Sequence, residues 1–195
     1  MKILLISDTH GDTALLANEI LPKYAHEVQM AIHLGDFAHD LLDMQCTYPN
    51  LPMVGVGGAF EMKEKSERII TVGDGKHRIL LTHGHMFNVK FGLDRLVYYA
   101  QEKGVDACFF GHTHTATQFV LTPRQSFALQ NFATPLGKGV TPPSQANDLI
   151  GGVIKNGIFF MNPGSVTEPR AAANGSFGIV TISLEGEFTA DVINV

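Results

Sequence analysis

Histidine, acidic residues or asparagine stand beside glycine in several short segments of this 195-residue chain. In chain order the segments are Asp8-Thr9-His10, Gly35-Asp36, Gly58-Ala59-Phe60-Glu61, His83-Gly84-His85, Gly111-His112-Thr113-His114 and Asn162-Pro163-Gly164-Ser165. Imidazole and carboxylate groups suit Mn, Fe, Zn, Co or Ni ions without selecting one of them. No cysteine takes part, so a closed structural zinc site is disfavoured. Two ions roughly 3.5–4 Å apart can clamp the attacking and leaving oxygens of a phosphoryl transfer, with a shared carboxylate as the natural bridge.

Most of these segments follow directly after a short apolar run that is typical of a buried strand. The runs cover residues 2–7, 30–34, 53–56, 77–82 and 107–110. Because ligands of α/β sheets bind outside the carboxyl ends of the strands, we expect the segments to converge on one site. A helix from Asp12 to about Tyr24 makes the opening β-α-β, which predicts a parallel sheet.

The rest of the chain departs from simple β-α alternation. Residues 68–72 and 77–82 flank a glycine-rich turn and predict a hairpin, and residues 91–103 predict a second helix closed by Gly104. Four later runs, 118–121, 157–161, 178–184 and 188–192, predict a mostly antiparallel sheet. The expected fold class is α/β, a two-sheet β-sandwich flanked by helices. Residues 1–195 are expected to form one domain, with an irregular insertion at about 122–150.

The composition bounds the class of protein. The chain is 45% hydrophobic and 17% charged, with a net charge of −5, so a broad basic surface for nucleic acid is disfavoured. Cys46 and Cys108 form no CxxC pair and are expected to be buried, reduced thiols. No apolar stretch approaches the length of a membrane span, and we expect a cytoplasmic protein.

With this ordered set of segments, the chain resembles the calcineurin-like metallophosphoesterases, in particular their small single-domain bacterial and archaeal phosphodiesterase branch. The resemblance runs from residue 1 to about 170. It implies a four-layer α-β-β-α fold, a dinuclear metal centre, and in-line attack on phosphorus by a metal-bridging hydroxide. Manganese is the most expected metal, with Fe, Zn, Ni, Co or Mg as alternatives, and the substrate is expected to be a small phosphate ester.

The resemblance also implies a role for each residue of the set. The first metal would be held by Asp8, His10 and His114, the second by His83 and His112, and Asp36 would bridge the two ions and share in catalysis. His85 is expected to contact the phosphate as a catalytic residue, and Arg170 is a candidate substrate-binding residue. The remaining histidines, His26, His33, His39 and His77, have no such context, which favours surface or satisfied core positions.

The departure from the family pattern is Ala59, which stands where the family places an asparagine that binds the second metal. Phe60 stands where larger members place a histidine proposed to protonate the leaving group, although the small branch often lacks it. If residues 59–61 are extended, Glu61 faces the same side as position 59 and is a candidate replacement ligand.

Two other functions remain open from the sequence. A eukaryotic retromer subunit resembles the small branch and works chiefly as a protein-binding scaffold, so a metal-poor scaffold is the alternative to an enzyme. DNA-repair nucleases share the motif set, but the acidic balance counts against nucleic acid as a partner. Homo-oligomer formation is left open as well.

Overall fold

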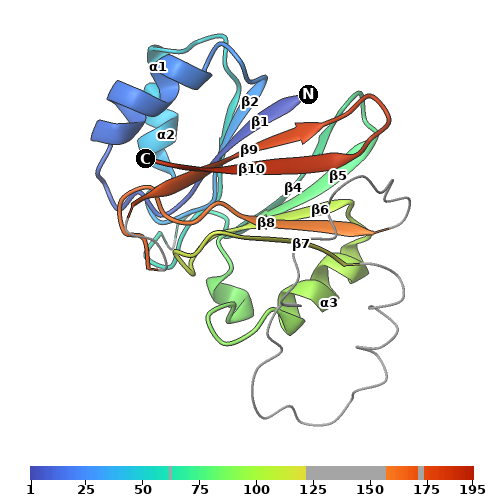
Figure 1. The fold of residues 1–195 in the computed structure, drawn as a ribbon. Coiled ribbons are helices and arrows are strands. Elements are labelled where there is room, and N and C mark those ends of the chain that lie inside the picture. The colour runs from blue at the N-terminus through green and yellow to red at the C-terminus, as the bar shows by residue number, and fades with distance from the viewer. Residues whose placement is uncertain (62, 122–156, 171–173) are drawn as a thin grey trace.

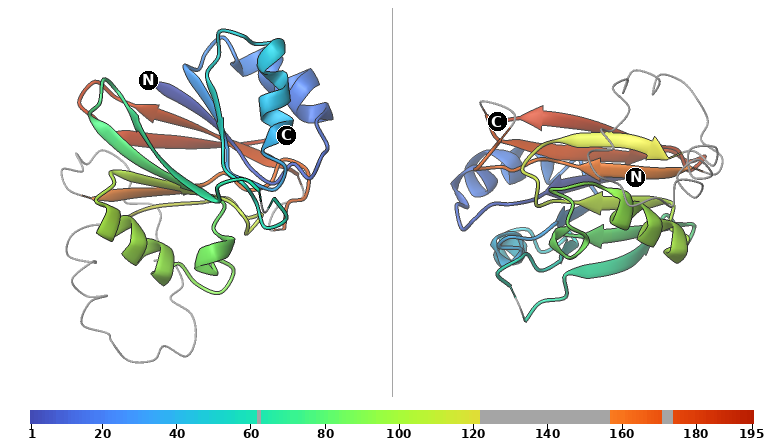
Figure 2. Two further views of the ribbon diagram at one scale, coloured as in Figure 1. Left: turned by 180° about the vertical axis from the view of Figure 1, so that it is seen from behind. Right: turned by 90° about the horizontal axis from the view of Figure 1, so that it is seen from below.

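The computed structural model describes residues 1–61, 63–121, 157–170 and 174–195. The insertion expected at about residues 122–150 lies outside the described residues. Within the described part, two mixed five-stranded sheets lie face to face with helices on both outer sides (Figures 1 and 2). The predicted α/β fold class with two stacked sheets is confirmed.

The first sheet has the strand order β10-β9-β1-β2-β3. Its strands are β1 (Lys2–Ile6), β2 (Met30–His33), β3 (Met53–Gly55), β9 (Ser176–Ile182) and β10 (Phe188–Asn194). The first three run parallel, as the β-α-β pattern predicts. Leu5 lies opposite Ile32 on one side and opposite Gly178 on the other, where β9 runs antiparallel.

The second sheet has the order β4-β5-β6-β8-β7. Its strands are β4 (Glu67–Val72), β5 (His77–Thr82), β6 (Ala107–Phe110), β7 (Thr117–Leu121) and β8 (Ile158–Asn162). The hairpin of β4 and β5 is confirmed. The C-terminal strands do not form a sheet of their own, since β8 lies between β6 and β7, parallel to the first and antiparallel to the second, while β9 and β10 join the other sheet.

Alternation along each strand creates three apolar layers. In β1, Ile3 and Leu5 point into the core between the sheets, whereas Leu4 and Ile6 pack under the N-terminal helices. In β6, Phe109 faces the core between the sheets and Phe110 packs with helix α3 (Asp94–Lys103). Because both faces of these strands are covered, they are apolar throughout.

The sequence explains where one helix ends and why another contains a wider turn. Helix α3 ends at Gly104, whose φ of 58° gives the left-handed cap predicted there. The predicted first helix is a π-helical segment, η1 (Leu16–Ile20), followed by α1 (Leu21–Tyr24). Pro22 accounts for the wider turn, since its ring clashes with the carbonyl four residues earlier and it lacks an N–H. Three short helices were not predicted: α2 (His39–Leu42), η2 (Asp43–Cys46) and η3 (His85–Phe87).

Both cysteines are free thiols, but the expectation that both are buried is wrong for Cys46, which is exposed in η2. Cys108 is buried in β6, where burial raises its pKa. The runs predicted at 107–110 and 157–161 are strands, and their phenylalanine pairs Phe109-Phe110 and Phe159-Phe160 are buried in the core. Among the described residues, no helix has both the length and the hydropathy that a membrane crossing requires.

Candidate metal centre

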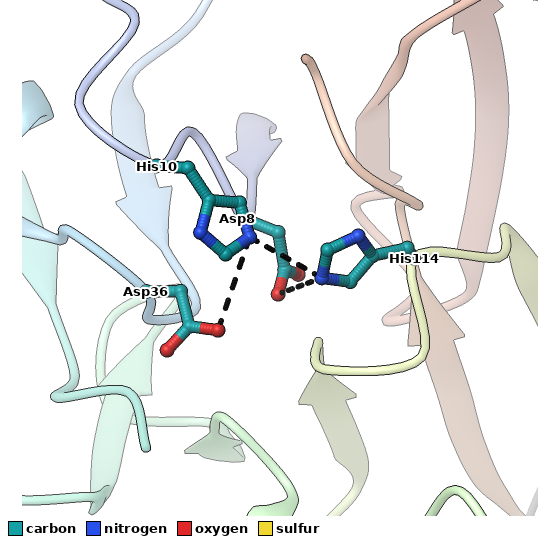
Figure 3. A group of neighbouring side chains, drawn as sticks. All are labelled: Asp8, His10, Asp36 and His114. Atoms are coloured by element: carbon teal, nitrogen blue, oxygen red, sulfur yellow. Dashed lines mark hydrogen bonds and ion pairs between the residues drawn. The ribbon is translucent and has the colours of Figure 1, made fainter. Parts of the chain in front are cut away.

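The residues of the expected ligand set meet where the carboxyl ends of strands from both sheets approach one another. Asp8 and His10 follow β1, Asp36 follows β2, His83 follows β5, and the pair His112 and His114 follows β6. Figure 3 shows the side chains of Asp8, His10, Asp36 and His114 pointing toward one another from the loops that follow three different strands. The convergence expected at the strand ends is therefore present.

Four side chains form the first group of candidate ligands: Asp8, His10, Asp36 and His114. His114 Nε2 lies 3.2 Å from Asp8 Oδ1 and 3.3 Å from His10 Nε2. His10 Nε2 lies 4.0 Å from Asp36 Oδ2. Asp8 is fully buried, yet its Oδ1 accepts no hydrogen bond, so a buried charged oxygen points into the group without a donor.

The second group consists of Asp36, His83 and His112. His83 Nε2 lies 3.3 Å from Asp36 Oδ2 and 2.9 Å from His112 Nδ1. The same oxygen of Asp36 therefore faces both groups. This is the geometry of a carboxylate shared between two neighbouring sites.

The backbone is strained at these residues. Asp8, His10, Asp36, His112 and His114 all have φ between 51° and 70°, a left-handed conformation that residues with a side chain adopt at a cost. They are five of the eight non-glycine residues with positive φ in the described part of the chain. Such strain collects at functional sites, where the surrounding structure has to hold it in place.

Two glycines beside the candidate ligands lie so close to neighbouring residues that no side chain fits at their positions. A Cβ at Gly58 would lie 2.1 Å from Asp36 Oδ1, and one at Gly111 would lie 2.1 Å from Ser7 Oγ. Both contacts are far shorter than van der Waals distance, so any side chain would displace a ligand loop. The glycines of these two motifs therefore serve packing around the ligands.

Hydrogen bonds fix which nitrogen each buried histidine presents. His83 Nδ1 donates to Leu34 O at 2.8 Å, and His114 Nδ1 donates to Glu168 O at 2.8 Å. When these rings are neutral, each Nε2 atom keeps its lone pair, which faces one of the two groups. This arrangement, with the other ring nitrogen bound to a carbonyl, is typical of metal-binding histidines.

The last motif supports the ligand loops from below. The Asn162 amide donates to Gly111 O at 2.9 Å, and the Ser165 hydroxyl donates to Asp8 O at 2.7 Å. Both side chains are fully buried. The motif thus ties the loop of His112 and the loop of Asp8 to one segment.

The carboxylates are held in their charged form. Burial raises the pKa of Asp8 and of Asp36, but the neighbouring imidazoles of His114 and His83, when protonated and no ion is bound, outweigh this effect and keep both pKa values below the usual range. His112 has its pKa lowered to about 4, first by burial and then by the charge of His83. An ionised carboxylate and a neutral imidazole are the forms that bind metal.

The distances fit divalent ions. Two nitrogen or oxygen ligands at about 2.1 Å from one ion lie about 3.0 Å apart at right angles and about 4.2 Å apart when opposite. The separations of 2.9–4.0 Å within the two groups agree with this range. The buried Asp8 Oδ1 accepts no hydrogen bond, and a cation in the first group would compensate its charge. The residues present therefore fit two ions that share Asp36.

Ala59 and Glu61 do not behave as the sequence suggested. Residues 58–61 form a turn in which Glu61 N donates to Gly58 O, so the expected extended segment is wrong. The Glu61 carboxylate accepts backbone N–H groups of Phe37 (3.1 Å), Ala38 (3.1 Å) and Gly58 (2.7 Å). Glu61 lies in neither ligand group of the described residues, and this geometry gives no support to the hypothesis that it binds metal.

His85 and Arg170 lie beside the groups. The His85 ring is 5.4 Å from that of His83, and its Nδ1 is buried without a hydrogen-bond partner. Burial and the charge of His83 lower the pKa of His85. Arg170 is exposed, and its backbone N–H donates to His114 O at 3.2 Å. Both residues are thus placed next to candidate ligands.

A buried hydrogen-bond chain was missed by motif analysis. Gly35 N–H donates to His33 Nδ1, His33 Nε2 lies 3.0 Å from Thr9 Oγ1, and that hydroxyl donates to Asp40 Oδ2 at 2.7 Å. His33 is a satisfied core histidine, as favoured from the sequence, and burial lowers its pKa to about 3. The chain joins the loop of Asp8 to the loop of Asp36, and no spacing in the sequence signals it.

Comparison with known proteins agrees with this geometry. The model of the calcineurin-like phosphoesterase superfamily domain matches residues 1–185, and the chain belongs to that superfamily. The probable metallophosphoesterase YsnB of Bacillus subtilis (strain 168) is 30% identical over 185 residues, which cover 93% of this chain and 85% of that protein.

Solved structures share the fold. A predicted phosphoesterase from Streptococcus pneumoniae TIGR4 superposes with a TM-score of 0.66 at 24% identity, covering 99% of this chain and 88% of that one. Wild-type Vps29 of Entamoeba histolytica, solved in complex with Zn²⁺, gives a TM-score of 0.60 at 18% identity, covering 100% and 99%. At these identities the likeness concerns the fold alone.

Proposed function

We propose that the protein is a divalent-metal-dependent phosphoesterase with a dinuclear centre, and in particular a phosphodiesterase. The observation that carries the proposal is the position of Asp36 Oδ2, which lies 4.0 Å from His10 Nε2 in one group and 3.3 Å from His83 Nε2 in the other. When bound, two ions supply Lewis-acid charge and an activated water nucleophile. Manganese is the ion we expect, because carboxylate oxygens contribute to both groups.

The chain's own residues define what else the site can do. His85 lies beside His83 and His112 with a free buried nitrogen, and we assign it to contact with the phosphate of the substrate. Arg170, next to His114, is assigned to the anionic part of the substrate. Phe60 is 81% exposed and has no proton to donate, so esters with good leaving groups should react faster than those that need an acid.

A metal-poor, protein-binding scaffold is the second candidate function. Ala59 offers no side-chain ligand, so the second group has three protein ligands where the first has four. A Vps29 protein shares the fold and was solved with Zn²⁺. In both candidates we place the protein in the cytoplasm, a proposal that the two free thiols support.

The deciding experiment combines metal analysis with hydrolysis of a phosphodiester across Mn²⁺, Zn²⁺, Co²⁺, Ni²⁺ and Mg²⁺. Asp36→Asn should lower turnover at least a hundredfold, since even groups that only orient a ligand cost roughly 10–100-fold. Asp191→Asn removes the same charge from exposed strand β10 and should leave turnover unchanged. If the protein hydrolyses the phosphodiester with none of the five ions, the result favours the scaffold function.

A further inference from the structure

A carboxylate outside the expected ligand set lies at the edge of the first group. Glu168 Oε2 is 3.7 Å from His10 Nε2, and the Glu168 side chain is 62% exposed. Three residues earlier, Ser165 closes the last motif, but position 168 belongs to none of the motifs found in the sequence. The contact brings a third negative side chain toward the group that already holds Asp8 and Asp36.

Which nitrogen of His10 the Glu168 carboxylate approaches distinguishes two possible roles, binding the metal and orienting a metal-binding histidine. A group that orients a metal-binding histidine bonds to the nitrogen that points away from the metal, as Leu34 O does for His83 and Glu168 O does for His114. The Glu168 carboxylate instead faces His10 Nε2, the same atom that points at His114 Nε2 and Asp36 Oδ2. Its oxygen therefore approaches the metal-facing side of the His10 ring, although Glu168 lies outside the four-residue group in which all ligand atoms are within 4.8 Å of one another.

The main chain of Glu168 is fixed to the loops of the first group. Its N–H donates to Ser165 Oγ at 2.8 Å, and the same hydroxyl donates to Asp8 O. Its carbonyl accepts from His114 Nδ1. Anchored on both sides, the residue keeps freedom only in its side-chain torsions, so the carboxylate can settle on an ion without movement of the backbone.

We propose that Glu168 is a further protein ligand of the first metal ion, an inference that rests on the proposed dinuclear centre. The 3.7 Å separation falls between the roughly 3.0 and 4.2 Å expected for neighbouring and opposite ligands of one ion. Asp8 Oδ1, buried and without a hydrogen-bond donor, independently marks the same group as a cation site. With Glu168 the site has carboxylate ligands from three side chains and imidazole ligands from two.

This ligand set has a consequence for metal selection. Carboxylate oxygens suit Mn²⁺, whereas imidazole nitrogens suit Zn²⁺ equally well or better. The second group, with one carboxylate and two histidines, lacks this enrichment in oxygen. Glu168 should therefore strengthen Mn²⁺ binding at the first site more than it strengthens Zn²⁺ binding.

The test is direct titration of the metal-free full chain with Mn²⁺, followed by electron paramagnetic resonance, and with Zn²⁺ by calorimetry. Glu168→Gln keeps the size and removes the charge. The matched control, Glu185→Gln, changes an exposed glutamate in the turn between β9 and β10, at the end of the sheet opposite the site (Figure 1). Visible absorption of the Co²⁺-loaded proteins reports a loss of one ligand, since it depends on coordination geometry.

We expect Glu168→Gln to weaken binding of the tighter Mn²⁺ ion at least tenfold, with a smaller effect on Zn²⁺ and a changed Co²⁺ spectrum. Glu185→Gln should match the unmodified protein in all three. If the unmodified protein binds Mn²⁺ and Glu168→Gln binds it equally well with the same Co²⁺ spectrum, the ligand role of Glu168 is overturned while the dinuclear centre stands. If the unmodified protein binds no divalent ion, the proposed function itself fails.

Discussion

The most direct test of how the fold positions Asp36 is the substitution Glu61→Gln. The Glu61 side chain is 13% exposed, and its two oxygens accept three backbone N–H groups from Phe37, Ala38 and Gly58. Phe37 follows Asp36, and both have positive φ, 72° and 51°. The glutamate thus holds a strained loop by charge-assisted hydrogen bonds.

The magnitude can be worked from these contacts. Glutamine has one acceptor oxygen, which can serve Phe37 and Gly58, so the N–H of Ala38 would face an NH₂ group. An unsatisfied buried donor costs roughly 1–3 kcal/mol, and the two remaining bonds each lose about 1 kcal/mol when the charge is removed. We therefore expect the free energy of unfolding to fall by about 3–5 kcal/mol.

The assay is urea unfolding of the metal-free protein in the presence of a chelator, so that bound ions contribute nothing to stability. With a slope near 2 kcal/mol per molar urea, the midpoint should fall by about 2 M. Glu64→Gln is the matched control, because Glu64 lies in the same loop but is exposed, and its effect should stay within about 0.5 kcal/mol. Equal midpoints for Glu61→Gln and the unmodified protein would refute the reasoning.

Three further predictions concern the same centre. Ala59→Asn adds a candidate ligand to the second group at a half-buried position. The more weakly bound ion should therefore bind about tenfold more tightly, and turnover should rise. Unchanged occupancy in a calorimetric titration would mean that the missing ligand at position 59 is already compensated. Gly111→Ala places a methyl group 2.1 Å from Ser7 Oγ and should lower stability by about 1–3 kcal/mol, measured by thermal unfolding. An unchanged stability would mean that the loop of Gly111 can move to accept the methyl group. His33 has a pKa of about 3 when folded against 6.5 when unfolded, so unfolding takes up a proton between these values. Its contribution to stability should fall by up to about 1.4 kcal/mol per pH unit as pH drops below 6.5. In urea titrations at pH 4–7, His33→Gln should reduce the slope of stability against pH by up to this amount, and His26→Gln, at an exposed position, should leave the slope unchanged.

The strands and the convergence of the motifs could be predicted because both depend on local patterns. Apolar runs such as 2–6 mark strands buried on both faces, and glycine-flanked ligands mark their carboxyl ends. The position of β8 between β6 and β7 could not be predicted, because strand order depends on partners far away in sequence. The C-terminal runs therefore looked like one antiparallel sheet, although they divide between two.

The roles of individual acidic residues were beyond the sequence for a related reason. The direction of the Glu61 side chain was inferred from an extended backbone, but the bond from Glu61 N to Gly58 O closes a turn, and the carboxylate accepts backbone N–H groups. Glu168 carries no motif, and only the fold brings its carboxylate beside His10. The contacts of the Glu61 carboxylate with Phe37 and of the Glu168 carboxylate with His10 join residues far apart in the chain, so spacing alone does not encode them.

The two oxygens of Asp36 have different partners, which makes an alanine at position 59 compatible with the proposed dinuclear centre. Oδ2 faces His10 and His83, while Oδ1 accepts the backbone N–H of Ala59 at 2.9 Å. That bond comes from the main chain, so it does not depend on which side chain position 59 carries. In the proposed dinuclear centre, alanine instead of asparagine at this position would therefore remove one ligand of the second ion but keep the carboxylate of Asp36 in place. Because the first group draws nothing from position 59, its ion should fill first, and Ala59→Asn should change the affinity of the second ion only.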